Sequence, residues 1–185
     1  MINLIQKKMK NYITLFVFLP IVSFVNAQVS VGGKQSVEGT ATVLDFNSIP
    51  ANAKGIILPA VDNLTNALTS VPADNNGTFL FDRSTSRVKM YENNIWRDLS
   101  NTGTSTQIVV NTTAESTNSQ GVIIGSETST AKGVLVLESE GKAMILPKIS
   151  NPHTSVKSPY PGMMCYDTVS KTLSVFNGTE WNYWK

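Results

Sequence analysis

The chain has 185 residues, of which fifteen are Lys or Arg, thirteen are Asp or Glu, and one is Cys. Because a single Cys cannot form a disulfide within the chain, the fold must be stabilised by the burial of side chains. Few charged residues and abundant Ser, Thr, Asn and Gly favour short strands joined by turns over amphipathic helices.

Residues 1–27 have the pattern of a signal peptide. Three lysines among the first ten residues precede an apolar run over 13–25, and small residues ending at Ala27 supply a cleavage site. A membrane-spanning helix needs roughly 20 apolar residues, so a retained anchor is the less favoured alternative. The sequence therefore predicts secretion to the extracellular space or the outer cell surface, with the periplasm as the alternative, and no membrane span after cleavage.

Cleavage changes the charge of the chain. It removes three lysines and no acid, which leaves 158 residues with twelve basic and thirteen acidic side chains, a net charge of −1. Binding of nucleic acid requires Lys and Arg to neutralise phosphates, so this balance excludes nucleic acid as an expected partner.

The segment 28–100 predicts a series of short strands. The strand-like stretches are 29–31, 43–46, 54–58, 78–82, 88–91 and a short strand that carries Trp96. Pro59 cannot donate a hydrogen bond to a sheet ladder, which suits the end of a strand. Asp82 opens the polar segment "DRSTSR", where its carboxylate can accept hydrogen bonds from the backbone of the turn.

The segment 122–185 repeats this order. "GMMCYDTVSKTLSVFNGTEW" (162–181) aligns without a gap with "GTFLFDRSTSRVKMYENNIW" (77–96), Lys142–Pro147 aligns with Lys54–Pro59, and 134–137 aligns with 43–46. The repeated scaffold positions are Gly77, Phe81, Asp82 and Trp96 in the first copy, and Gly162, Tyr166, Asp167 and Trp181 in the second. We interpret the two tryptophans as buried scaffold residues.

Tight hairpins are expected within both copies. Asn177-Gly178 is a strong signal for such a turn because both residues tolerate positive φ, and Glu92-Asn93 is a weaker version. The chain is thus predicted to be all-β, with two copies of a small β-meander unit in an elongated arrangement. Residues 101–121, which are mostly Ser, Thr, Asn, Gln and Gly, form the predicted linker between them, with a short strand at 107–110 as an option.

The doubled pattern resembles the tail-fibre-like repeats of secreted bacterial surface proteins and phage tail fibres. The shared sequence pattern is an apolar "AxLD" start, then "KG-apolar-LP", then a Gly, Tyr-Asp and Trp at fixed spacing. This chain departs from it at Phe81, Asn93, Ala143 and Met144. The resemblance implies a non-catalytic β module of a fibre or surface assembly, with a trimer as the expected form of self-association, and it carries no catalytic residue.

Residues with catalytic potential are few, and each has a structural explanation. His153 is the single histidine and lies in the irregular stretch "NPHTS", so a zinc cluster of histidines cannot form. Cys165 lies within a strand without electropositive neighbours and is interpreted as a small core residue. Asp82 and Asp167 are interpreted as turn formers rather than as a carboxylate pair. We predict no catalytic, cofactor-binding or metal-binding residues, and no enzyme.

Aromatic residues near the carboxyl end are the candidate interaction surface. Tyr160, Tyr183 and Trp184 could provide a platform for a glycan if they are exposed, whereas burial would make them core residues. Asp167-Thr168-Val169 also resembles a bacterial O-glycosylation acceptor, although the match is only three residues long.

The small size of each unit points to partners. Isolated meanders are marginally stable, and repeat arrays generally need at least three units, whereas two are present here. The leading hypothesis is a secreted, non-catalytic structural or interaction module that associates with itself or with another protein. The alternative is a carbohydrate-binding or adhesive surface protein.

Overall fold

The computed structural model describes residues 28–47, 53–68, 71–110, 112–113 and 121–185. The expected signal peptide lies outside the described residues. Strands dominate, and the helical elements are single turns: η1 (Leu64–Ala67), η2 (Pro72–Asn75) and α2 (Pro152–Ser155). Within the described residues, no helix has the length and apolar character needed to cross a membrane. The prediction of an all-β fold is confirmed.

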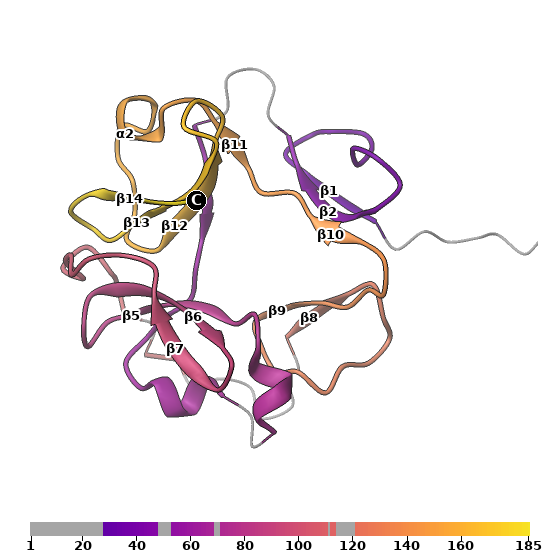
Figure 1. Cartoon of the computed structure of the whole chain (residues 1–185), viewed down its shortest axis with the longest axis horizontal. Coiled ribbons are helices and arrows are strands. Elements are labelled where there is room, and N and C mark those ends of the chain that lie inside the picture. Colours follow the sequence, from indigo (N-terminus) through magenta and orange to yellow (C-terminus); the bar gives the residue numbers. More distant parts are fainter. Residues whose placement is uncertain (1–27, 48–52, 69–70, 111, 114–120) are drawn as a thin grey trace, which may run out of the picture.

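The strands form four small sheets (Figure 1). The first has the order β1-β2-β10, from β1 (Val29–Val31), β2 (Thr42–Phe46) and β10 (Ala143–Met144). The second has the order β4-β5-β6-β7, from β4 (Ala60–Val61), β5 (Phe79–Asp82), β6 (Arg87–Glu92) and β7 (Ile95–Asp98). The third has the order β11-β12-β13-β14, from β11 (Lys148–Ile149), β12 (Met163–Asp167), β13 (Thr172–Phe176) and β14 (Trp181–Trp184), and β3 (Ile56–Ile57) also pairs with β12. The fourth is β8 (Val122–Ile124) beside β9 (Leu135–Leu137).

The second and third sheets have corresponding strand pairings. In each, a two-residue strand runs parallel to the first strand of an antiparallel meander, with Ala60 opposite Phe81 and Lys148 opposite Tyr166. The first and fourth sheets differ, because in the described part of the chain β2 has neighbours on both sides, whereas β9 has a neighbour on one side alone. The division into units 28–100 and 122–185 therefore stays a prediction.

Strands cross between the two halves of the sequence. β3, from the first half, pairs antiparallel with β12, and β10, from the second half, pairs parallel with β2. Figure 1 shows these exchanges as an indigo-to-purple strand beside β12 and an orange strand beside β2. The four sheets lie around a common centre, so the single chain does not have the elongated shape that the sequence suggested. The exchanged strands hold the halves side by side.

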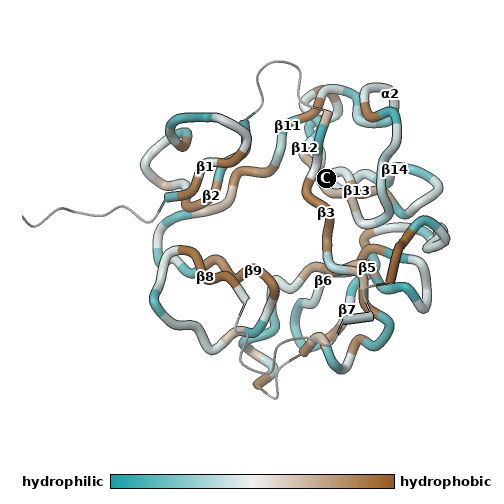
Figure 2. The backbone as a smooth tube through the Cα atoms, turned by 180° about the vertical axis from the view of Figure 1, so that it is seen from behind, coloured by the Kyte–Doolittle hydropathy of each residue, from teal (hydrophilic) through white to brown (hydrophobic). Residues whose placement is uncertain are grey.

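The core is shared by both halves. One cluster of buried side chains joins residues of the second and third sheets, namely Leu58, Phe81, Val88, Leu99, Met164 and Val175. A second cluster lies within the third sheet and its flanking segments, namely Ile149, Val156, Met163, Cys165 and Phe176. Figure 2 shows the hydrophobic segments concentrated in strands such as β3, β8 and β9, with hydrophilic loops between the sheets.

The tight hairpin turns lie one residue later than predicted. β6 and β7 are joined through Asn93 and Asn94, which both have positive φ (49° and 65°), as a type I′ turn requires. In the second hairpin the Asn177 N–H donates to the Glu180 carbonyl (3.2 Å), and Gly178, with φ 94°, is the first central residue. Asn177 itself closes the turn: its Oδ1 accepts the N–H groups of Thr179 and Glu180.

The first part of the predicted linker is packed against the sheets. The Gly103 N–H donates to the Ser86 carbonyl (2.8 Å) and the Thr104 N–H donates to the Asn177 carbonyl (3.0 Å). The prediction of a short strand at 107–110 is wrong, because these residues form no strand. The Ile108 N–H instead donates locally to the Ser105 carbonyl, and its side chain packs on the core. Residues 111 and 114–120 of the linker lie outside the described residues.

Candidate interaction surface

The carboxylate of Asp82 closes the turn between β5 and β6. Its Oδ1 accepts the N–H (2.9 Å) and the hydroxyl (2.6 Å) of Ser84, and its Oδ2 accepts the hydroxyl of Thr85 (2.6 Å). Burial by itself would raise the pKa of Asp82, but these hydrogen bonds and the charge of Lys89 outweigh it and hold the pKa below its usual value. The ionised carboxylate of Asp82 therefore stabilises the turn between β5 and β6.

Asp167 plays the same part in the third sheet and also fixes a distant loop. It accepts the N–H of Val169 (2.9 Å), the N–H and hydroxyl of Ser170 (3.3 and 2.6 Å) and the N–H of Asn151 (3.0 Å). Burial raises the pKa of Asp167, but the bonds from Ser170, Val169 and Asn151 lower it by more, so the net shift is downward. Among the described residues, no group of three or more His, Cys, Asp or Glu side chains could hold a metal ion.

Cys165 and His153 lack the setting of catalytic groups. Cys165 is fully buried in β12, and burial, followed by the charge of Asp167, raises the pKa of its thiol to about 12. His153 is exposed and lies in the one-turn helix α2, not in the irregular stretch expected from the sequence. Pro152 begins that turn, because proline is favoured at the first helical position. The His153 Nδ1 lies 3.1 Å from the hydroxyl of Tyr183.

The repeated scaffold residues occupy corresponding places, but the tryptophans are not fully buried. Phe81 has no exposed surface, whereas its counterpart Tyr166 is half-buried. Trp96 and Trp181 are half-buried, because each lies at the outer strand of its sheet. Trp96 contacts Tyr91 at a ring-centroid distance of 5.1 Å, and Trp181 contacts Phe176 at 5.5 Å.

Gly77 and Gly162 precede the first meander strand in each copy, with φ of 85° and 84°. This is the left-handed region that favours glycine. Gly162 is buried against Leu58 and Phe81, whereas Gly77 is exposed, with no atom within 4 Å of a Cβ built on it.

The candidate surface residues do not gather in one place. Tyr183 and Trp184 are exposed (41 % and 46 %), but neighbouring residues of a strand point to opposite faces of the sheet. On one face Tyr183 contacts His153. On the other face the Trp184 indole N–H donates to the carbonyl of Leu99, directly after β7 (2.5 Å). Tyr160 is half-buried on the second core cluster and its hydroxyl accepts the N–H of Val109 (3.2 Å).

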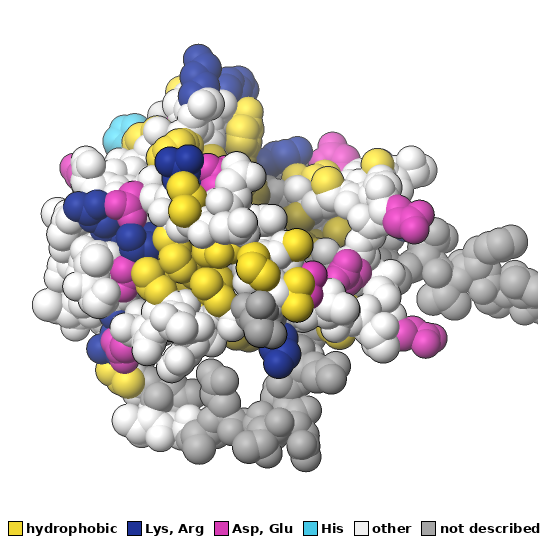
Figure 3. All heavy atoms as spheres, turned by 60° about the horizontal axis from the view of Figure 1, so that its bottom comes forward, with side chains coloured by type: hydrophobic (Ala, Val, Ile, Leu, Met, Phe, Trp, Pro, Cys, Tyr) yellow, Lys and Arg dark blue, Asp and Glu magenta, His cyan; other side chains and the backbone are white. Residues whose placement is uncertain are grey.

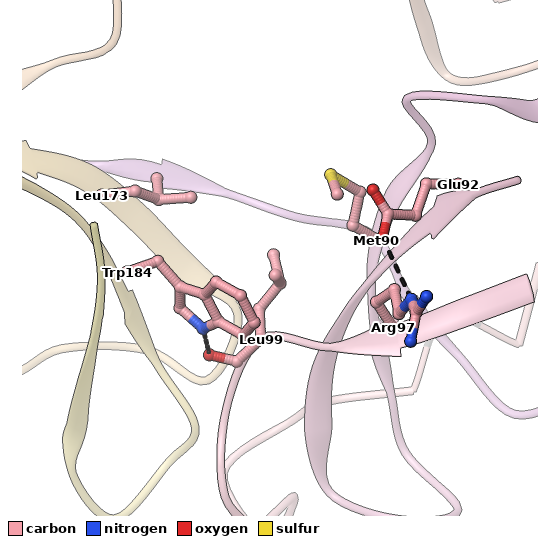
Figure 4. A pocket seen from close by; sticks show the side chains of 6 residues that line it. All are labelled: Met90, Glu92, Arg97, Leu99, Leu173 and Trp184. Carbon is pink, nitrogen blue, oxygen red and sulfur yellow. Dashed lines mark hydrogen bonds and ion pairs between the residues drawn. The ribbon is translucent and has the colours of Figure 1, made fainter.

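A groove of about 350 Å³ lies between the second and third sheets, beside the core that they share (Figure 4). Its lining residues are Met90, Glu92, Arg97, Leu99, Leu173 and Trp184. Glu92 and Arg97 form an ion pair across neighbouring strands (3.0 Å), and Trp184 forms the opposite wall. Sequence reasoning named only Trp184, because the other residues come from strands whose juxtaposition depends on how the two sheets meet.

Several exposed hydrophobic side chains do not line this groove. Figure 3, which brings the lower side of Figure 1 forward, shows hydrophobic side chains gathered near the middle of that face. In the β8–β9 sheet and the segment entering β9, Val122, Val134 and Leu135 are 58 %, 68 % and 46 % exposed. Sequence reasoning missed these residues because the matching segment of the first half has the same apolar pattern. In that segment Val43 and Leu44 are buried, so the pattern alone does not indicate which of the two segments is exposed.

Comparison with known protein families gives a match to the carboxyl-terminal part of the chain. Residues 123–185 match the family model of a phage tail like trimerisation region. The predicted resemblance to tail-fibre-like proteins is confirmed by this match. The matched segment is about a third of the chain and runs from within β8 to the end of β14. Neither a curated protein nor a solved structure matches the chain significantly.

Proposed function

We propose that the protein is an exported structural subunit that associates as a trimer and forms part of a fibre-like assembly at the cell surface. The observation that carries this proposal is the match of residues 123–185 to a trimerisation region of phage tail type. The exposed hydrophobic residues of β8–β9 lie within or directly beside that region, which supports their coverage by another chain.

The mass of the purified protein in solution tests self-association. Sedimentation equilibrium at micromolar concentration is expected to give three times the mass of one chain. A folded protein that remains at the mass of one chain throughout that range would overturn the proposal.

Export is tested separately from assembly. The lysine-rich start and apolar run of residues 1–27 support cleavage after Ala27. We expect the extracellular or surface fraction to contain a chain that begins at Gln28, and deletion of residues 1–27 to retain the protein inside the cell. Equal distribution of both forms would contradict export by this segment.

The proposed role requires no chemical turnover. The burial and raised pKa of Cys165 and the use of Asp82 and Asp167 within their own turns support a non-catalytic role. The match to a structural tail-like region supports it independently.

A second candidate function is binding of a glycan in the groove. Trp184, with an exposed ring fixed by its bond to Leu99, faces the Glu92–Arg97 pair, a combination of stacking surface and polar groups suited to a sugar. Glycan-array binding that Trp184→Ala abolishes and Tyr183→Ala leaves intact would support this candidate. Binding that is absent, or insensitive to Trp184→Ala, would exclude it.

A further inference from the structure

Within the chain, β10 covers one edge of β2. The Ala143 N–H donates to the Ala41 carbonyl (2.8 Å), and the Ile145 N–H donates to the Leu44 carbonyl (2.9 Å). With β1 on its other side, Leu44 is only 2 % exposed. The second half thus supplies a strand that completes a sheet of the first half.

The matching edge in the second half has no such cover. Leu135 of β9 aligns with Leu44 but is 46 % exposed. The Val134 carbonyl accepts the Val122 N–H of β8 (2.9 Å), so the alternation of the backbone turns the Leu135 carbonyl away from β8. Among the described residues, no strand pairs with this edge of β9.

β3, the counterpart of β10, pairs with β12 on one edge, and no strand of the described residues pairs with its other edge. The Leu58 N–H, directly after β3, donates to the Gly162 carbonyl beside β12 (3.0 Å), so alternation directs the Ile57 N–H to the opposite side. Ile57 aligns with Ile145, the donor that serves β2, and is 52 % exposed. Figure 2 shows that both β3 and β9 are hydrophobic segments.

We propose that β3 of a second copy of this chain pairs in parallel with the free edge of β9. In this arrangement the N–H groups of Gly55 and Ile57 donate to the carbonyls of Lys132 and Leu135, as Ala143 and Ile145 donate to Ala41 and Leu44 within the chain. The inference rests on the proposed function, since it specifies which strands join the copies of the trimer.

A second contact, between the segment after β10 and the residue before β5, is consistent with the same association of two copies. Within the chain, the Gly162 carbonyl accepts from Leu58, whereas the matching Gly77 is exposed. Leu146 aligns with Leu58. When β3 of a second copy lies on β9 of the first copy, the Leu146 N–H of the first copy can therefore reach the Gly77 carbonyl of the second copy. The contact joins different surfaces of the two copies, and such a head-to-tail contact forms a closed ring when the rotation between copies permits.

Disulfide cross-linking tests the register. Within the chain Met144 is paired with Leu44, and the corresponding pair between copies is Ile56 with Leu135. The double variant Ile56→Cys/Leu135→Cys is expected to give covalent dimers and trimers after mild oxidation, alkylation and a non-reducing gel. Each single variant should stay at the mass of one chain. The double variant Leu44→Cys/Met144→Cys is the matched control and should link within one chain.

The outcomes separate this inference from the proposed function. If sedimentation gives a trimer but Ile56→Cys/Leu135→Cys links only within one chain or not at all, the strand assignment is overturned and the trimer stands. Links between copies in Leu135→Cys/Met144→Cys, without links in Ile56→Cys/Leu135→Cys, would assign β10 to this edge and also overturn it. A single-chain mass for the unmodified protein would overturn both.

A charge at the edge tests the same surface without a cross-link. Leu135→Lys alters a side chain that is exposed in the single chain, so folding should be retained, but it places a charge where the strand of the second copy would bury leucine. We expect trimer affinity to fall about 10- to 100-fold per contact. Val169→Lys, at a turn residue that is 56 % exposed, is the control and should leave affinity unchanged. Equal affinities for both variants would overturn the inference.

Discussion

Replacement of Asp167 by Asn should cost the protein much of its stability, and only at a pH where the carboxylate is ionised. The side chain is 2 % exposed and accepts four hydrogen bonds, two of them on the oxygen that bonds to Ser170. An amide of the same size keeps one acceptor oxygen but turns an NH₂ group toward the remaining donors. Loss of two charge-assisted bonds, at about 1.5–3 kcal/mol each, lowers the free energy of unfolding by about 3–6 kcal/mol.

The pH dependence follows from the lowered pKa of Asp167. Burial raises this pKa, but the hydrogen bonds outweigh it, so the folded state binds the proton more weakly than the unfolded chain does. The stabilisation is therefore fully present above about pH 4, the unfolded value, and is lost as the pH falls through the folded value. Urea unfolding followed by tryptophan fluorescence, at one fixed protein concentration, should show the full difference at about pH 7 and a much smaller one near pH 2.

Asp62→Asn is the matched control for this experiment. Asp62 forms an ion pair with Arg83 (2.7 Å), but its side chain is 69 % exposed. Its replacement should change the free energy of unfolding by no more than about 0.5 kcal/mol, because exposed ion pairs contribute little. A loss for Asp167→Asn that is as small as this, or that is equal at both pH values, would refute the assignment of the carboxylate to the turn.

Three further predictions concern the core, the thiol and the packed linker. Phe81→Ala should lower the free energy of unfolding by about 3–5 kcal/mol, because Phe81 is fully buried; urea titration measures it. Cys165 should not react with a thiol reagent at about pH 8 until denaturant is added, because its pKa is raised to about 12; reaction in the folded protein would contradict its burial. Gly178→Ala should reduce the melting temperature far more than Gly33→Ala. Both glycines have positive φ, but only at Gly178 would a Cβ lie 2.0 Å from the Thr104 carbonyl; equal effects would exclude that contact as the cause.

The local chemistry of the meanders could be predicted from short sequence patterns. Asp82 and Asp167 bond to residues two and three positions ahead, and such contacts depend on neighbours in the chain. The second hairpin turn lies one residue later than predicted because Asn177 closes its turn with its side chain instead of occupying a central position. Turn residues reveal that a hairpin exists more reliably than they reveal its register.

The candidate surfaces could not be predicted in the same way. Leu44 and Leu135 occupy matching positions in the repeat, yet one is buried by β10 and the other is exposed. Trp184 faces the second sheet through its bond to Leu99, 85 positions away in the chain. A pattern read along one strand does not identify its neighbouring strands.

The sequence by itself determined the β character of this protein, the meanders and their carboxylate-closed turns, because these follow from interactions between residues that are close along the chain. Only the tertiary structure decided that β3 and β10 exchange between the halves and that the first part of the linker packs against the Asn177 turn. It also decided that one edge of β9 has no strand partner among the described residues. The two segments that were predicted as copies carry strands of the same pattern, and these strands offer similar hydrogen-bonding edges. The sequence of either copy therefore cannot specify which edge is filled within the chain and which is left for a partner.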